Sequence, residues 1–522
     1  MQGAQSPISY PLSFSEYTRA LADSHVVLYN TEIVILSVQI FLYNTMLHFV
    51  RTFAFVCVLA FASLPLSAAE IQPIKYVFLF IGDGMSFAQQ QMAEEFVQKT
   101  ENRGLKINAM PYQTITTTHG ADVFVTESAA AATAIASGSK TTSRGVGLDA
   151  NGDRVESIAE LALKNGRKVG IISSVTINHA TPAAFYAHNT SRNNYYEIGL
   201  DMIAANFDYF GGGGVDRNND RNNENYKGDI YALAREAGYT VARTVAEIRT
   251  LKPGEDNAKK VMAFPHSGAI PYALDSNEGD IRLPEFTKQA IELLDNPNGF
   301  FIMVEGGKID WACHNNDGAA AILDIIEFDD AVKAAFEFAD KKPGEVLIVV
   351  TGDHETGMLS VSHSSTGAQV YVSLLANQKV SRDVLIPSTE RFIRNGGENA
   401  TFENFKPFIT ENTGLTFTEE GRWQAGNLNL TQNEMRDLEN DFNRTKAAVE
   451  ENAGSGRDRV AQTMLRMLNN KSGLTWGSGG HTAMPVMTAA WGNQAETVVR
   501  AIRDNTDIGK QLKMAVGVMP GR

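Results

Sequence analysis

Three apolar runs, each leading to an acidic residue beside glycine, constrain the fold of this 522-residue chain more than any other feature. The runs and their acids are 76–80 with Asp83, 299–303 with Glu305, and 346–350 with Asp353. Ligands of open α/β sheets collect at the carboxyl ends of the strands. One acid in such a place is ordinary turn chemistry, but three of them predict a common site at one edge of a sheet.

Helical patterns alternate with strand-like runs along the chain. We expect helices at 156–164, 284–294 and 319–340 and strands at 169–173, 299–304 and 346–350. This alternation predicts an α/β three-layer sandwich with a central, mostly parallel sheet flanked by helices. The glycine run at 211–214 is expected to let a strand turn sharply rather than to cradle a phosphate.

Ser128 stands between an acidic residue and a run of alanines and other small residues, in the segment 125–134. Such a run can begin a helix, which would place Ser128 at or near a helix N-terminus. There the free N–H groups and the positive end of the helix dipole favour an attacking alkoxide and a phosphate. Alone, this pattern is typical of a simple helix cap, so its functional interpretation depends on the acid and histidine clusters elsewhere.

Histidine accompanies the acidic residues at positions suited to metal binding. Asp310 and His314 are one helical turn apart, so both side chains can face one ion. Asp353 and His354 are adjacent, which suits a loop whose side chains turn toward one ion. Carboxylate and imidazole ligands suit zinc, whereas an oxygen-only site made of the other two acids and a hydroxyl would suit magnesium.

Six motifs, in this order along the chain, resemble those of the alkaline phosphatases. They are 83–85, the Ser128 segment, 180–184 with 190–192, 304–310, 351–357 and 479–482. The resemblance extends from about residue 76 to residue 491 and is weak between 362 and 478. It implies an enzyme that hydrolyses phosphate monoesters to an alcohol and inorganic phosphate at alkaline pH. It also implies a phosphoserine intermediate and a site with two zinc ions and one magnesium ion.

The same resemblance implies a role for each site residue. Ser128 would be the nucleophile, and Arg192 would clamp two phosphoryl oxygens. The implied ligands are Asp310, His314 and His481 for the first Zn²⁺, Asp83, Asp353 and His354 for the second, and Asp83, Thr181 and Glu305 for Mg²⁺. The chemistry agrees, since a serine hydroxyl needs a metal or a base to become a good nucleophile. A guanidinium fork also matches the geometry of a phosphoryl group.

Three positions depart from the best-known bacterial pattern of that family. His179 and Trp311 stand where the pattern has aspartate and lysine, and Glu127 replaces the aspartate before the nucleophile. Glu127 could still pair with Arg192, and Trp311 is expected to pack along the site. His179 is expected either to support the third metal through a hydrogen bond or to bind it directly. Cys313 is expected to be a small buried residue rather than a zinc ligand.

The overall charge limits the kinds of partner that the chain can bind. The formal net charge is −14 and no basic stripe is apparent, so we expect no nucleic-acid-binding surface. Anionic substrates would be attracted by the metals and Arg192 rather than by the field of the whole protein. The expected partners are small-molecule phosphomonoesters and, because homodimers are usual in the resembled family, a second copy of the chain.

The N-terminal region has the pattern of a targeting segment. A short basic region begins at Met46, an apolar core follows at 52–66, and 67–69 are small residues, as in a secretory signal peptide. We expect residues 1–45 to be an artefact upstream of the true start, a signal peptide at 46–69 cleaved after about Ala69, and a mature catalytic domain at 70–522 without a membrane span. The expected location is periplasmic or secreted. A membrane anchor is the alternative, because residues 33–43 are also apolar, although neither this run nor 52–66 reaches about 18 uninterrupted residues.

Residues 362–478 are expected to form a helical insertion, with helices at 433–452 and 455–470 that carry charge on most faces. Such a segment could border the active site or a subunit interface, or it could be a solvated appendage without chemistry. Two other functions stay open. One is a phosphodiesterase or sulfatase on a similar metal scaffold, and the other is a non-catalytic phosphate- or zinc-binding protein.

Overall fold

The computed structural model describes residues 39, 41–50, 73–418, 424 and 426–517. Contacts divide the chain into two units, residues 1–71 and residues 72–522. In the first unit, residues 41–50 are helical. Most of the expected signal peptide and of the expected upstream artefact lies outside the described residues. Within the described part of the chain, no helix is both long and apolar enough to cross a bilayer.

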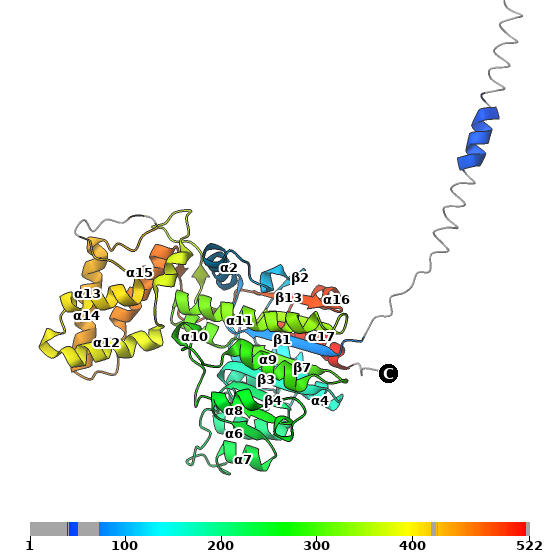
Figure 1. The fold of residues 1–522 in the computed structure, drawn as a ribbon, viewed down its shortest axis with the longest axis horizontal. Coiled ribbons are helices and arrows are strands. Elements are labelled where there is room, and N and C mark those ends of the chain that lie inside the picture. The colour runs from blue at the N-terminus through cyan, green and yellow to red at the C-terminus, as the bar shows by residue number, and fades with distance from the viewer. Residues whose placement is uncertain (1–38, 40, 51–72, 419–423, 425, 518–522) are drawn as a thin grey trace, which may run out of the picture. The chain divides into compact units, whose positions relative to one another are not determined.

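A nine-stranded sheet forms the centre of the second unit (Figure 1), in the order β2-β13-β8-β1-β7-β3-β4-β6-β5. The strands are β1 Tyr76–Gly82, β2 Tyr112–Thr116, β3 Lys168–Thr176, β4 Tyr209–Gly213, β5 Thr240–Ala242, β6 Val261–Ala263, β7 Phe300–Glu305, β8 Val346–Gly352 and β13 Val486–Gly492. β13 pairs antiparallel with β2 and β8, whereas the other neighbours in this sheet pair in parallel. The predicted α/β architecture with a mostly parallel sheet is therefore confirmed.

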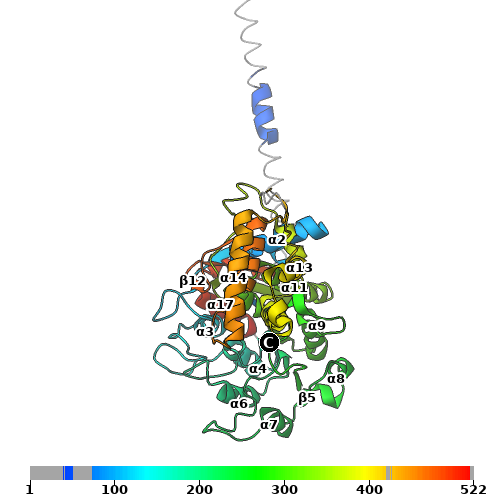
Figure 2. The same ribbon diagram turned by 90° about the vertical axis from the view of Figure 1, so that its left-hand side faces the viewer.

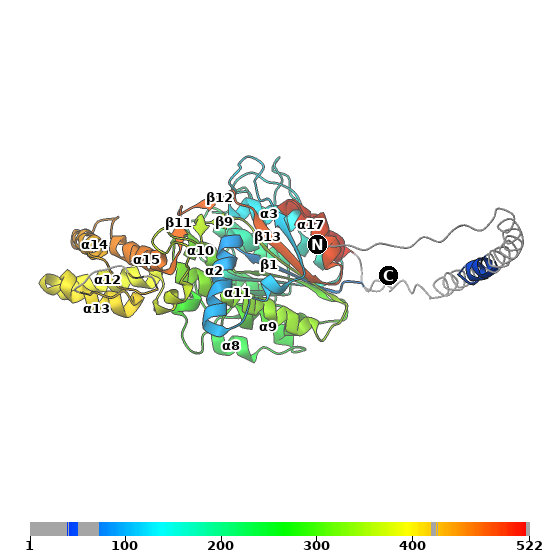
Figure 3. The same cartoon turned by 90° about the horizontal axis from the view of Figure 1, so that it is seen from above.

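Helices cover both faces of the sheet, because alternate residues of each strand point to opposite sides. The helices of these layers are α2 Phe87–Glu101, α3 Ser128–Ser137, α4 Ile158–Lys164, α5 Ala180–Ala183, α6 Tyr195–Ala205, α7 Ile230–Glu236, α8 Val245–Thr250, α9 Leu283–Leu294, α10 Lys308–His314, α11 Gly318–Ala339, α16 Ala495–Ala501 and α17 Asn505–Gly517. Phe78 and Phe80 of β1 belong to one apolar core with α2, α9 and α11. Val77 and Leu79 belong to a second core with α3, α4 and α17, and Figure 3 shows α3 and α17 on the opposite side of the sheet from α2, α9 and α11.

The six expected helices and strands are present, with their ends within three residues of the predicted bounds. The glycine run at 211–214 does not turn the strand as expected, because β4 continues as far as Gly213 and only Gly214 lies beyond it. Gly212 has φ 118°, and a Cβ there would collide with the carbonyl oxygen of Ser173 in β3. The glycines therefore let β4 approach β3 closely, beside the register shift between Ser173 and Thr176.

The expected insertion is a helical segment between the short strands β10 Leu359–Ser360 and β11 Thr475–Trp476, which pair with each other. Its helices are α12 Arg382–Gly396, α13 Phe402–Thr413, α14 Gln432–Glu450 and α15 Arg459–Ser472. Figure 1 shows these helices gathered at one end of the unit, with α10 on the side of the sheet nearest to them, and Figure 2 shows α13 and α14 from that end. The expectation of charge on most faces is wrong for α15, because Val460, Met464 and Leu468 are buried in the apolar core.

Candidate functional site

The central strands β8, β1, β7 and β3 are neighbours in the sheet, and they end at the same edge. Pairing places Gly82 of β1 opposite Gly352 of β8 and Ile81 opposite Glu305 of β7. Ser173 of β3 also lies opposite Glu305. The acidic residues that end or follow these strands therefore lie at one level, at the edge where open α/β sheets bind ligands.

A first cluster joins Asp310 and His314 of α10 with His481 of β12 His481–Thr482. Their ligand-type atoms lie within 4.8 Å of one another. Asp310 lies 3.3 Å from His314 Nε2 and 3.6 Å from His481 Nε2, and the two imidazole nitrogens are 3.1 Å apart. Backbone carbonyls contact the other nitrogen of each ring at 2.7 and 3.0 Å. Both Nε2 atoms are therefore directed at the same carboxylate, as expected of metal ligands.

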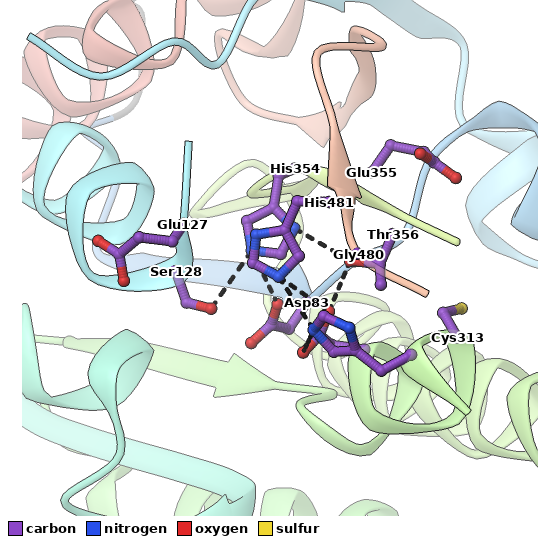
Figure 4. Close-up of polar contacts among 12 residues, drawn as sticks. Asp83, Glu127, Ser128, Cys313, His354, Glu355, Thr356, Gly480 and His481 are labelled. Atoms are coloured by element: carbon purple, nitrogen blue, oxygen red, sulfur yellow. Dashed lines mark hydrogen bonds and ion pairs between the residues drawn. The ribbon is translucent and has the colours of Figure 1, made fainter. Parts of the chain in front are cut away.

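A second cluster joins Asp83, Asp353 and His354, which are all fully buried. His354 Nε2 lies 3.4 Å from Asp83 Oδ1 and 3.4 Å from Asp353 Oδ2. The Ser128 hydroxyl lies 3.3 Å from the same nitrogen, and Figure 4 shows it turned toward His354 and Asp83. The backbone N–H of Gly84 donates to Asp353 at 3.1 Å. Ser128 thus faces the second cluster from the start of α3.

A third cluster shares Asp83 and adds His179 and Glu305. Thr181 Oγ1 donates to Asp83 Oδ2 at 3.4 Å, and Ser173 donates a short hydrogen bond to Glu305. Burial, together with the positive charge of Arg192, lowers the pKa of His179 to about 3, so the ring is neutral. Arg192 donates to His179 Nε2 at 3.0 Å, which leaves the proton of the neutral ring on Nδ1.

The clusters hold more negative charge than the surrounding residues neutralise. Burial and the neighbouring carboxylates raise the pKa of Asp83 and Asp353 well above the usual range, and burial raises that of Glu305 to about 7. One oxygen of each of these three carboxylates has no hydrogen-bond partner among the described residues. Buried, unpaired carboxylates are strongly unfavourable. Together with the histidines they form donor sets that fit divalent cations.

Arg192 is tied to the start of α3. Its Nη1 donates to Glu127 at 2.6 Å, and Glu127 caps the helix by accepting hydrogen bonds from the N–H groups of Ala129 and Ala130 at 3.1 and 2.8 Å. Burial raises the pKa of Glu127, but the charge of Arg192 and the hydrogen bonds from Arg144 N–H, Arg192 and Ala130 N–H outweigh burial and hold it below its usual value. The ion pair therefore fixes the guanidinium relative to the first residues of the helix.

A family model for alkaline phosphatase matches residues 74–518. The chain belongs to the alkaline phosphatase family. It is 31% identical to alkaline phosphatase 4 of Bacillus subtilis (strain 168) over 398 residues, which cover 74% of this chain and 75% of that protein. The crystal structure of Thermus thermophilus alkaline phosphatase has 25% identity and a TM-score of 0.71, covering 85% of this chain and 92% of its own. The cold-active alkaline phosphatase of a psychrophilic Shewanella sp. shares the fold at 24% identity and a TM-score of 0.69, over 84% of this chain and 99% of its own.

The protein is therefore an enzyme that hydrolyses phosphate monoesters. Membership of this family also implies that it binds divalent metal ions. The three clusters contain the residues of this chain that are candidate ligands for such ions. The residues of the predicted metal sites lie together, and the predicted nucleophile lies beside them. Their individual roles are taken up below.

Trp311 and Cys313 lie on α10 beside the first cluster. Trp311 is half-buried and stands edge-on to His179, with ring centroids 6.1 Å apart, and Lys308 Nζ lies 4.7 Å from its ring. Cys313 is fully buried and belongs to none of the metal-binding groups found among the described residues. Burial raises the pKa of its thiol well above the usual value, which keeps it protonated and a poor ligand.

Two hydroxyls that hold the carboxylates were not predicted from the sequence. Thr356 Oγ1 donates to Asp310 at 2.6 Å, and Ser173 donates to Glu305. Thr356 lies within the motif at 351–357, so its proximity to the site could have been inferred from that motif. Ser173 ends the expected strand at 169–173 and gives no comparable signal, because only the order of the strands brings it beside Glu305.

Proposed function

We propose that Ser128 is the nucleophile of a two-step hydrolysis of phosphate monoesters. The observation that supports this most directly is the 3.3 Å distance between Ser128 Oγ and His354 Nε2, at the start of a helix and beside buried carboxylates. The positive end of the α3 dipole favours both the alkoxide and a bound phosphoryl group, although Glu127 accepts the N–H groups of Ala129 and Ala130. Position and electrostatics therefore favour attack by Ser128.

The first and second clusters have the imidazole and carboxylate ligands that suit zinc, and the third, with the hydroxyl of Thr181, suits magnesium. When bound, these cations would lower the pKa of the serine hydroxyl and offset the negative charge of phosphate. His179 Nε2 accepts a hydrogen bond from Arg192, which favours a role in positioning Arg192, and direct metal binding would use Nδ1, which has no hydrogen-bond partner among the described residues. Trp311 would line the site by packing against it.

The bond changes follow from the positions of Ser128 and Arg192. Ser128 Oγ releases its proton to solvent and forms a bond to phosphorus as the bond from phosphorus to the alcohol oxygen breaks. The alcohol oxygen keeps the electron pair and takes up a proton. Water then attacks the phosphoserine, which releases inorganic phosphate and restores the hydroxyl. Glu127 and His179 each engage one terminal nitrogen of Arg192, and the second N–H of each nitrogen stays available for a phosphoryl oxygen.

Replacing Arg192 with alanine should lower kcat/KM for p-nitrophenyl phosphate by about 10- to 100-fold, because charge-assisted hydrogen bonds to the phosphoryl group are lost. Arg192→Lys should recover only part of the loss, since an ammonium cannot form the bidentate fork. The matched control is Arg221→Gln, which removes the charge of an exposed arginine on the polar loop before α7. An equal fall in kcat/KM in the Arg192 and Arg221 variants would contradict the role assigned to Arg192.

Relative rates on three esters separate this function from its alternatives. We expect fast hydrolysis of a phosphate monoester and much slower hydrolysis of a phosphate diester and a sulfate ester, since Arg192 and the clusters can engage the terminal oxygens of a dianionic phosphoryl group. A preference for the diester or the sulfate ester would favour the other hydrolase classes. Tight metal binding with no turnover of any of the three would favour a non-catalytic binding protein.

We further infer that residues 46–69 direct export, that the protein acts in the periplasm or outside the cell, and that it assembles as a homodimer. The signal-peptide pattern supports the first two points, and family membership supports the third. N-terminal sequencing of the exported protein should begin near residue 70, and light scattering should give twice the monomer mass. An N-terminus far upstream, or a monomer at working concentrations, would contradict these inferences.

A further inference from the structure

A polar cavity of about 430 Å³ lies between α10 and the helical insertion. We call it the insertion pocket and define it by His314 of α10, Arg382 of α12, Arg466 and Asn470 of α15, and Trp476 of β11. His314 is also a member of the first cluster, so the pocket adjoins the proposed metal centre. It is formed only because the insertion folds back beside α10.

The insertion pocket is positively charged in a chain of net charge −14. Arg382 and Arg466 line it, and no aspartate or glutamate is among its lining residues. Arg382 is already engaged, by an ion pair with Asp458 at 2.7 Å and a hydrogen bond to Asn315 at 2.6 Å. Arg466 is exposed and has no ion pair or hydrogen bond within the described part of the chain. An anion in the pocket would find in Arg466 a cation without a competing carboxylate.

The pocket also contains amide side chains that can donate hydrogen bonds. Asn470 of α15 lines the same wall as Arg466, and Asn315 and Asn316 line the wall beside α10. An amide N–H can donate to an oxyanion or a hydroxyl of a ligand. The arginine and the amides together therefore point to an oxygen-rich ligand.

The positions of Ser128 and His314 indicate that the ligand of the pocket is the leaving group of the substrate. Displacement at phosphorus is in line, so the leaving oxygen departs on the side opposite to the attacking oxygen. Ser128 lies beside the second cluster, which leaves the first cluster, with His314, for the departing side. His314 also lines the insertion pocket. An alcohol leaving across the first cluster would extend into it.

We infer that the insertion pocket binds the leaving group and selects phosphate monoesters whose alcohol carries a second anionic group, a carboxylate or a further phosphate. This inference rests on the proposed function and adds a substrate class to it. Arg466 provides the charge, and the amide of Asn470 provides orientation. A second cavity, lined by Phe87, Met358 and Met484, is apolar and includes no member of the three metal clusters, so it is less suited to this role.

The test compares 3-phosphoglycerate with glycerol 3-phosphate, two three-carbon monoesters that differ in a carboxylate against a hydroxymethyl group. The wild-type enzyme should prefer 3-phosphoglycerate in kcat/KM by about three- to tenfold, in the range of one favourable contact between an arginine and a carboxylate. Arg466→Gln should lose most of this preference, chiefly through a higher KM for 3-phosphoglycerate. The preference should also weaken at high ionic strength, because the contact is exposed to solvent.

Arg436→Gln is the matched control, because it removes an equally exposed arginine of the insertion that does not line the pocket. It should keep the wild-type preference between the two substrates. An absent preference in the wild-type enzyme, or an equal loss in the Arg436 and Arg466 variants, would overturn the inference while normal hydrolysis of p-nitrophenyl phosphate leaves the proposed function intact. Failure to hydrolyse any monoester would overturn the proposed function and this inference with it.

Discussion

Replacing Ser128 with alanine should lower kcat for p-nitrophenyl phosphate by roughly 10³–10⁵-fold, because the atom that receives the phosphoryl group is removed. Ser128 is 1% exposed and is the first residue of α3, and alanine is a favourable residue in a helix. The melting temperature and the metal content of the variant should therefore match the wild type. Steady-state kinetics, thermal unfolding and elemental analysis of the same preparations measure all three quantities.

Ser137→Ala is the matched control for this variant. Ser137 is a buried serine of the same helix, and its hydroxyl donates to the carbonyl of Thr133 at 2.7 Å. Its removal should cost about 1 kcal/mol of stability through that hydrogen bond and should leave kcat close to the wild-type value. If Ser128→Ala retained activity comparable to that of Ser137→Ala, Ser128 would not be the nucleophile.

Removing divalent metal with a chelator should abolish turnover and lower the melting temperature. The four buried carboxylates of the clusters would then face one another without cations, and three of them already have a raised pKa. An ion held at 100 to 1,000 times its Kd stabilises the folded state by about 3 to 4 kcal/mol. Addition of Zn²⁺ and Mg²⁺ together should restore both the activity and the melting temperature, as measured by kinetics and calorimetry.

Two histidine variants test whether the first cluster binds the metal that the chelator removes. His481→Ala should reduce the zinc content by about one ion per chain, because a structural or catalytic zinc site rarely keeps full affinity after loss of one ligand. His119→Ala removes an exposed histidine outside the three clusters and should leave the metal content unchanged. Full activity in the chelated enzyme, or equal metal content in the two variants, would contradict the metal assignment.

The carboxyl ends of the strands were predictable from the sequence because the signal is local. Asp83, Glu305 and Asp353 each end or follow an apolar run, and a parallel sheet brings such ends to one edge whatever the strand order. The spacing of Asp310 and His314 likewise needs only one helical turn. Local patterns of this kind predicted the fold class and the edge of the sheet at which the candidate site lies.

Other features depend on contacts between distant segments and could not be read from the sequence. The hydrogen bond from Arg192 to His179 Nε2 joins two loops. The nitrogen of His179 that accepts this bond could be identified only from the geometry. The role of the glycines in β4 was not predicted, because it depends on the close approach of the neighbouring strand β3. The insertion pocket needs α15 to lie beside α10, which no motif in the weakly similar segment 362–478 specifies.

Identification of the phosphorylated residue is the most direct test of the proposed two-step reaction. The enzyme would be mixed with p-nitrophenyl phosphate, quenched in acid within the turnover time, digested, and mapped by tandem mass spectrometry, with Ser128→Ala beside it. We expect phosphate on Ser128 in the wild type and at no site in the variant. Phosphate on a different residue, or an unmodified Ser128 during rapid turnover under conditions that preserve phosphoserine, would contradict the role assigned to Ser128.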